Sequence, residues 1–139
     1  MQDNETTYRR WIEEVWNEGR EELIEELFDK DGVAFYPYLV NGGEPIRGRD
    51  KFKKFLKLLR KNYSEIKIKI SDLATDGNKI VSLCEIKVVP VDEDAAAEPL
   101  ETTGLSRIMF KDGKIVEIWN NTTAAGQGRD FELLKLDNT

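Results

Sequence analysis

The stretch Tyr63-Ser64-Glu65-Ile66-Lys67-Ile68-Lys69-Ile70-Ser71 is the point at which the chain changes from helical to extended patterning. Before it, apolar side chains recur every three or four positions, at Phe52, Phe55, Leu56, Leu59 and Tyr63. Within it, isoleucine alternates with lysine or serine. The first spacing gives a helix one apolar face, whereas strict alternation is typical of a strand with one buried face. The sequence therefore predicts a helix over residues 48–63 that runs directly into a strand.

Two shorter helices and one strand are expected upstream. The first helix has an apolar stripe at positions i, i+3, i+4, i+7 and i+8, formed by Tyr8, Trp11, Ile12, Val15 and Trp16, and Gly19 ends it. The stripe repeats on a second helix at Leu23, Ile24, Leu27 and Phe28. Residues 33–38 are expected to form a short strand before a glycine-rich loop.

Three strands are expected downstream, over residues 80–89, 102–110 and 115–122, joined by turns or by an acidic connector at 91–99. We expect tails at 1–6 and 126–139. The element order is then ααβαββββ within a single domain, 1–139. Helices followed by a run of strands indicate an α+β fold, here a curved antiparallel sheet of four or five strands packed on three helices. Such a sheet forms a cone whose wide end can hold a pocket.

The composition excludes several kinds of chemistry. The 139 residues include no histidine and one cysteine, Cys84, and they carry a net charge of -6. Ser-His-Asp catalysis, histidine–metal sites, internal disulfides and Cys-Cys zinc sites are therefore excluded, and we expect neither a metal nor another cofactor. The acidic balance disfavours nucleic acid as a partner, and no apolar run reaches the ~18 residues of a membrane span. With no visible signal peptide, a cytoplasmic setting is expected.

Three stretches give the chain a resemblance to a known family. They are Trp16-Asn17-Glu18-Gly19 with the apolar residues at 23–28, Glu44-Pro45-Ile46-Arg47-Gly48-Arg49-Asp50-Lys51-Phe52, and the hairpin at 110–119. With these three stretches in this order, the chain resembles the SnoaL-like polyketide cyclase branch of the nuclear transport factor 2-like superfamily. The resemblance covers about residues 8–126. The resemblance implies a cone fold that hosts several activities, so function has to be argued from the site.

Two catalytic positions of the related ketosteroid isomerases are changed in this chain. Their general base, an aspartate before a proline, corresponds by resemblance to Tyr36, which precedes Pro37. Their oxyanion-donor tyrosine corresponds to Ile12. A tyrosine with an ordinary pKa near ~10 is a poor base at neutral pH, so isomerisation by that mechanism is not expected.

The acid/base aspartate of SnoaL-like cyclases also has no counterpart here. It corresponds by resemblance to Thr123, with Asn121 as the alternative on the same strand face. Neither side chain titrates near pH 7, but both can hydrogen-bond to a carbonyl or enol oxygen. The Asp-Arg-Asp arrangement of the superfamily's epoxide hydrolases would require Glu85 and Glu101 beside Arg107.

These residues predict a cavity and its ligand. Trp119, Asn121 and Thr123 share strand parity if no bulge intervenes. We expect a cavity lined by Tyr36, Phe55, Leu59, Trp119, Asn121 and Thr123, which binds a small, largely apolar molecule and supports carbonyl or enol chemistry of the cyclase or isomerase type. The alternatives are a non-catalytic binding or dimerisation module, and a hydrolase or isomerase that uses Glu85 or Glu101. Cys84 is expected to be a small core residue.

Two surface features bear on partners. Residues 47–69 carry ten basic and two acidic side chains, whereas residues 1–31 carry four basic and eleven acidic ones. We expect the basic helix to face the acidic helices rather than RNA. The apolar residues on the outer face of the predicted sheet, Val81, Leu83, Leu105 and Met109, indicate burial there, and the resemblance implies a homodimer through that face.

Overall fold

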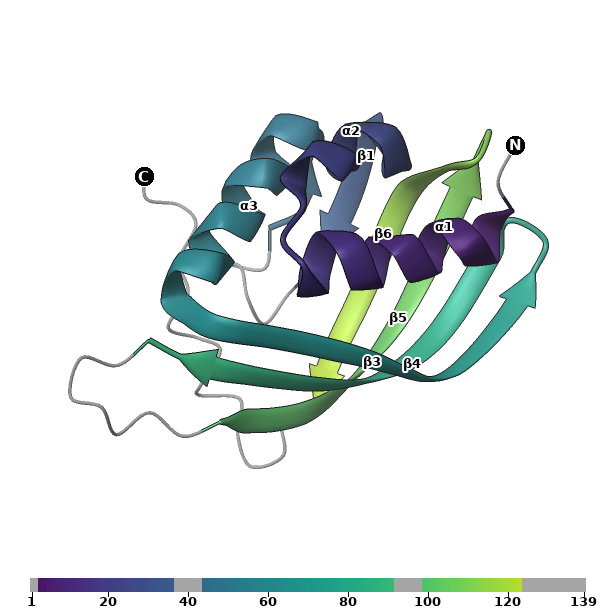
Figure 1. The fold of residues 1–139 in the computed structure, drawn as a ribbon. Helices are drawn as coiled ribbons and strands as arrows, with labels where there is room; N and C mark the ends of the chain where they lie inside the picture. The colour runs from purple at the N-terminus through teal and green to yellow at the C-terminus, as the bar shows by residue number, and fades with distance from the viewer. Residues whose placement is uncertain (1–2, 37–43, 92–98, 124–139) are drawn as a thin grey trace.

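The helices pack on one face of a curved sheet, with α3 inserted between the second and third strands of the chain (Figure 1). The computed structural model describes residues 3–36, 44–91 and 99–123. The elements in order are α1 (Asn4–Arg10), the π-helical η1 (Trp11–Asn17), the 3₁₀ turn η2 (Glu21–Leu23), α2 (Ile24–Leu27), β1 (Phe28–Phe35), β2 (Ile46–Arg47), α3 (Arg49–Asn62), β3 (Tyr63–Asp76), β4 (Lys79–Pro90), β5 (Leu100–Lys111) and β6 (Lys114–Thr123). This arrangement confirms the α+β cone and the direct passage from the third helix into a strand.

The sheet has six strands in the order β2-β1-β6-β5-β4-β3. The last four strands form the expected antiparallel meander. The expectation of a wholly antiparallel sheet is wrong for β1, which runs parallel to β6 and places Phe35 opposite Trp119. Alternating burial reveals which face a residue occupies but not the direction of the neighbouring strand, so the sequence pattern carried no signal for this pairing. The strand β2 was also not expected.

Three boundaries differ from expectation. Helix α1 begins at Asn4, inside the stretch expected as a tail, because the Asp3 carboxylate caps it by accepting a bond from Thr6 N at 2.7 Å. The second helix is reduced to a 3₁₀ turn and one α turn, and β1 begins at Phe28 rather than at residue 33. Strand β4 ends just before the predicted acidic connector, and β5 begins just after it. Residues 92–98 of that connector and the predicted tail at 126–139 lie outside the described residues.

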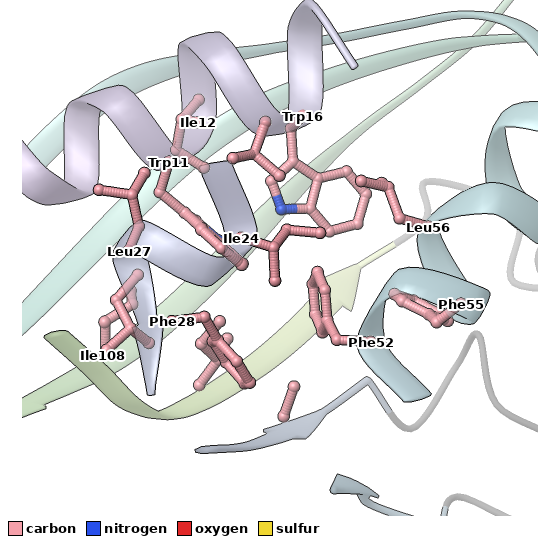
Figure 2. Packing of buried hydrophobic residues seen from close by; sticks show 14 of the residues in the cluster. Trp11, Ile12, Trp16, Ile24, Leu27, Phe28, Phe52, Phe55, Leu56 and Ile108 are labelled. Carbon is pink, nitrogen blue, oxygen red and sulfur yellow. The ribbon is translucent and has the colours of Figure 1, made fainter. Parts of the chain in front are cut away.

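Aromatic rings hold the helices to the sheet (Figure 2). The ring of Trp11 stacks on Phe28 with centroids 5.5 Å apart, and it lies 5.1 Å from Phe52. Trp16 meets Phe52 and Phe55 edge-on. Phe52 thus joins η1, β1 and α3 at one point, and all of these rings are buried. Each such ring removes about 150–250 Å² from water, so this cluster dominates the packing between the helices and the sheet.

A bulge in β6 decides which of its side chains face the helices. The register between β5 and β6 shifts after Met109, which is opposite Glu117, because Phe110 is opposite Ile115. Ile115 and Ile118 are therefore both buried although they are three residues apart. An undisturbed strand would place residues three apart on opposite faces. Beyond the bulge, even-numbered residues of β6 face the core and odd-numbered residues face outward.

Candidate functional site

A cavity of about 70 Å³ lies between η1 and the inner face of the sheet. Its walls come from seven elements, together with Tyr36 just after β1, and are mostly apolar. They include Trp11, Ile12 and Trp16 from η1, Leu59 from α3, Ile66 and Ile68 from β3, Ile86 and Val88 from β4, Ile108 from β5 and Ile118 from β6. A void of this size exceeds the ~10–15 Å³ that one water needs and is about half of an engineered apolar cavity that holds benzene.

The void exists because the inner face of β4 and β5 carries small side chains at its middle. Cys84 and Gly104 are opposite each other in the register, and Ser106 follows on the same face. Further along the strands, larger side chains such as Val88 and Ile108 belong to the buried core. Small residues between large ones leave an unfilled space that the surrounding backbone does not collapse to close. Cys84 is buried as expected, but it also lines the cavity.

Polar groups in and beside the cavity wall contact one another in a group of three and in one pair. The Tyr8 hydroxyl lies 3.6 Å from the Cys84 Sγ, which also lies 3.4 Å from the Ser82 hydroxyl. The Asn120 amide donates to the Ser106 hydroxyl at 2.7 Å. These hydroxyl, thiol and amide groups are thus engaged with one another.

Tyr36 presents a different situation. Its side chain is only 7% exposed, lines the cavity, and stacks on Phe55 with ring centroids 5.1 Å apart. Within the part of the chain that the structure describes, no group forms a hydrogen bond to its hydroxyl. An unpaired buried hydroxyl costs free energy, and a polar ligand atom or a water would relieve that cost.

Both cavity tyrosines are held in the neutral form. Burial raises the pKa of Tyr36 well above its usual range, and the nearby Cys84 adds to the effect. Burial likewise raises the pKa of the Tyr8 hydroxyl, again with a contribution from Cys84. The two hydroxyls therefore act as hydrogen-bond donors and not as bases at neutral pH.

The structure brings together only part of the predicted site. Tyr36 and Leu59 line the cavity, whereas Phe55 is fully buried behind Tyr36 and supports it. Trp119 is 43% exposed on the opposite face of the sheet, where it packs on Phe35 at 5.2 Å. Asn121 is exposed on that same outer face. The prediction that Trp119 and Asn121 line the cavity is thus corrected.

The bulge at Val116 is the physical reason for this correction. It moves the inward positions of β6 by one residue, so Ile118 and Asn120 line the cavity in place of their neighbours. Thr123 is the last residue of β6, opposite Thr103, and its side chain lies outside the described residues. Sequence reasoning missed Asn120 by one position. The signal for it was the spacing of three between Ile115 and Ile118.

No carboxylate lines the cavity among the described residues. Glu85 and Glu101 are exposed and lie along an open groove outside it. Arg107 pairs with Glu117 at 3.3 Å on the outer face, so an epoxide hydrolase arrangement is not formed. Within residues 3–36, 44–91 and 99–123, no three side chains of the histidine, cysteine, aspartate or glutamate type are grouped closely enough to hold a metal ion.

Ion pairs join the basic helix to the acidic segment before it. Lys53 of α3 lies 2.7 Å from Glu25 of α2, and Lys57 lies 3.8 Å from Glu21 of η2. The Arg49 guanidinium donates to the backbone oxygens of Phe28 and Glu25 at 2.7 and 2.8 Å. Some of the basic side chains of α3 therefore bind groups of the same fold. None of the helices in the described residues is both long and apolar enough to cross a membrane.

The comparisons agree with this cone fold. A model of the SnoaL-like domain matches residues 8–118, and the chain therefore belongs to the SnoaL-like domain family. Among curated proteins there is no match to the sequence.

Solved structures share the fold at low sequence identity. IdmH from Streptomyces antibioticus, a proposed polyketide cyclase, is 20% identical, with a TM-score of 0.72 over 87% of this chain and 92% of that one. A SnoaL-like polyketide cyclase from Agrobacterium tumefaciens is 13% identical, with a TM-score of 0.72 over 88% and 93% of the two chains. An NTF2-like protein of unknown function from Burkholderia pseudomallei is 18% identical, with the same TM-score over 89% and 93%. At these identities the likeness shows the fold alone.

The raised pKa values predict how stability depends on pH. Because the folded state holds Tyr8 and Tyr36 neutral while unfolded tyrosines ionise near pH ~10, their contribution is complete below that pH. The free energy of unfolding should then fall as pH rises above ~10. Urea denaturation between pH 7 and 11 measures this, and Tyr36→Phe should show a shallower fall than the unmodified protein. Equal slopes for the two proteins would contradict the assignment.

Proposed function

We propose that this protein binds a small, largely apolar molecule with a carbonyl or enol oxygen, and that the Tyr36 hydroxyl donates a hydrogen bond to that oxygen. The observation that carries the proposal is the buried Tyr36 hydroxyl, which lines an apolar cavity without a partner among the described residues. The apolar walls favour a ligand of low polarity, because each buried CH₂ group is worth about 0.8 kcal/mol. Family membership supports the proposal, since SnoaL-like polyketide cyclases share the fold.

The cavity supports stabilisation of an enol or enolate more than proton transfer. A neutral tyrosine can donate to a developing oxyanion, and its strength as a donor grows in a site that excludes water. A general base would have to be a group with a pKa near neutrality within reach of the ligand, and the described lining supplies none. We therefore propose cyclase- or isomerase-type chemistry in which Tyr36 donates a hydrogen bond to the developing oxyanion. The exposure of Glu85 and Glu101 counts against the carboxylate alternative. A binding module without catalysis remains the second candidate, favoured by the missing aspartate.

The ketone cyclopentanone and its hydrocarbon analogue methylenecyclopentane test the hydrogen bond, since they match in shape and differ in the oxygen. Tyr36→Phe should weaken cyclopentanone binding by about 1 kcal/mol, close to fivefold, and leave methylenecyclopentane binding unchanged. Titrations followed by the fluorescence of Trp11 and Trp16, in a Trp119→Phe background that removes the exposed tryptophan, measure both affinities.

Tyr8→Phe is the matched control for that experiment. Its hydroxyl already contacts Cys84, so its loss should lower the free energy of unfolding by about 1 kcal/mol without changing the preference for the ketone. Tyr36→Phe should leave stability unchanged or raise it, since it removes an unpaired buried hydroxyl. An equal loss of ketone and hydrocarbon affinity in Tyr36→Phe, or absence of binding by both probes, would contradict the proposal.

The setting and partners proposed from the sequence fit this picture. We propose a cytoplasmic protein without a nucleic-acid partner. Cys84 is a free, buried thiol, which suits a reducing compartment. The pairing of Lys53 and Lys57 with acidic side chains supports a structural use of the basic helix.

We also propose a homodimer through the outer face of the sheet. Four large apolar side chains there form an outer apolar patch, namely Val81, Leu83, Leu105 and Trp119, each between 38% and 51% exposed. Leu83 and Leu105 are opposite each other in the register, whereas Arg107 lies between Val81 and Trp119 on the three neighbouring strands. Exposed apolar side chains gathered on one sheet face support a self-complementary twofold interface.

Light scattering at tens of micromolar should show a dimer of the unmodified protein. Leu105→Asp places a charge in the outer apolar patch and should shift the protein to a monomer. Thr103→Asp is the matched control, since it places the same charge on the same strand face beyond the patch, and it should remain dimeric. A monomeric unmodified protein would overturn the dimer.

A further inference from the structure

Four isoleucines belong to the linings of both the cavity and an open groove, and they mark the partition between these two spaces. They are Ile12, Ile66, Ile68 and Ile86. Ile12 belongs to η1, whereas Ile66 and Ile68 belong to β3. The partition therefore lies where the N-terminal helical segment meets β3, which is an edge strand of the sheet.

The Asn17 side chain joins these two elements directly. Its Oδ1 accepts from the Ile68 backbone N–H at 2.7 Å, and its Nδ2 donates to the Ile68 backbone oxygen at 2.9 Å. Strand β3 has a neighbour, β4, on one side only, so these backbone groups point away from the sheet. The Asn17 amide thus makes, at Ile68 alone, the two hydrogen bonds that a neighbouring strand would make there.

The end of η1 is otherwise attached by side chains. The Arg60 guanidinium donates to the backbone oxygen of Trp16 at 2.9 Å. It passes so close to Gly19 that a Cβ there would lie 2.7 Å from it, and Gly19 also has a φ of +75°. By contrast, the walls made by β4, β5 and β6 are bonded to strands on both sides. The contact between η1 and β3 is instead made by side-chain hydrogen bonds without a strand ladder, as expected of a contact that opens locally.

We propose that ligands enter the cavity between η1 and β3, and that the two hydrogen bonds between Asn17 and Ile68 hold this gate closed. The inference rests on the proposed binding function and adds the route and its control. A closed gate predicts slow association, because binding waits for a sparsely populated open state.

Stopped-flow mixing of cyclopentanone with the Trp119→Phe protein tests the gate through the fluorescence of Trp11 and Trp16. Asn17→Ala removes both bonds and should raise the association and dissociation rates by the same factor, on the order of tenfold, while the dissociation constant stays the same. Equal acceleration of both rates is the signature of an easier opening, since damage to the cavity itself would change the dissociation constant. Hydrogen exchange at the Ile68 amide should accelerate in parallel without ligand.

Asn62→Ala is the matched control. Its amide donates to the Leu58 oxygen on α3 at 2.7 Å, outside both the cavity and the groove linings, and both rates should stay at the unmodified values. If Asn17→Ala does not fold, Asn17→Asp, which keeps the acceptor and loses the donor, should show a smaller acceleration of the same kind. Two results in a folded Asn17 variant would overturn the gate and leave the proposed function standing. One is unchanged association and dissociation rates, and the other is a changed dissociation constant without equal acceleration of both rates. Failure of the unmodified protein to bind either probe would overturn both.

Discussion

The burial of both Ile115 and Ile118 is the constraint on which the site depends. Two inward side chains three residues apart require a bulge in β6, and the bulge sets the facing of every later residue of that strand. It directs Asn120 into the cavity and sends Trp119 to the outer face. Without it, Glu117 would occupy an inward position and bury a carboxylate among apolar groups, at a cost of several kcal/mol. One local irregularity thus keeps charge out of the core and adds Trp119 to the outer apolar patch.

The cavity lies within a SnoaL-like domain, and its polar lining groups are hydroxyls, a thiol and an amide. The position that resembles the general base of the ketosteroid isomerases is Tyr36, and the structure does place this residue in the cavity wall. Burial favours its neutral form, so a group that would accept a proton is replaced by one that donates a hydrogen bond. Tyr8, Ser106 and Asn120 add neutral donors and acceptors around the same space. The proposed binding and polarisation of a ligand oxygen rest on this wall.

Sequence patterning predicted the element order, the α+β cone and most of the core, because the change from a period of 3.6 to a period of 2 is strong around Tyr63. It predicted Tyr36 and Leu59 at the cavity. It failed for Trp119 and Asn121 because strand parity is lost at a bulge, and it failed for the direction of β1 because alternation does not encode strand direction. The contacts of Asn17 with Ile68 could not be predicted, since they join residues 51 positions apart.

The central claim is that the Tyr36 hydroxyl donates to a ligand oxygen inside the cavity. The ¹³C chemical shift of carbonyl-labelled cyclopentanone reports this bond directly, because a hydrogen bond to the oxygen draws electron density from the carbonyl carbon. The bound ketone should resonate further downfield in the unmodified protein than in Tyr36→Phe, and Tyr8→Phe should match the unmodified protein. The same bound shift in the unmodified protein and in Tyr36→Phe would contradict the claim.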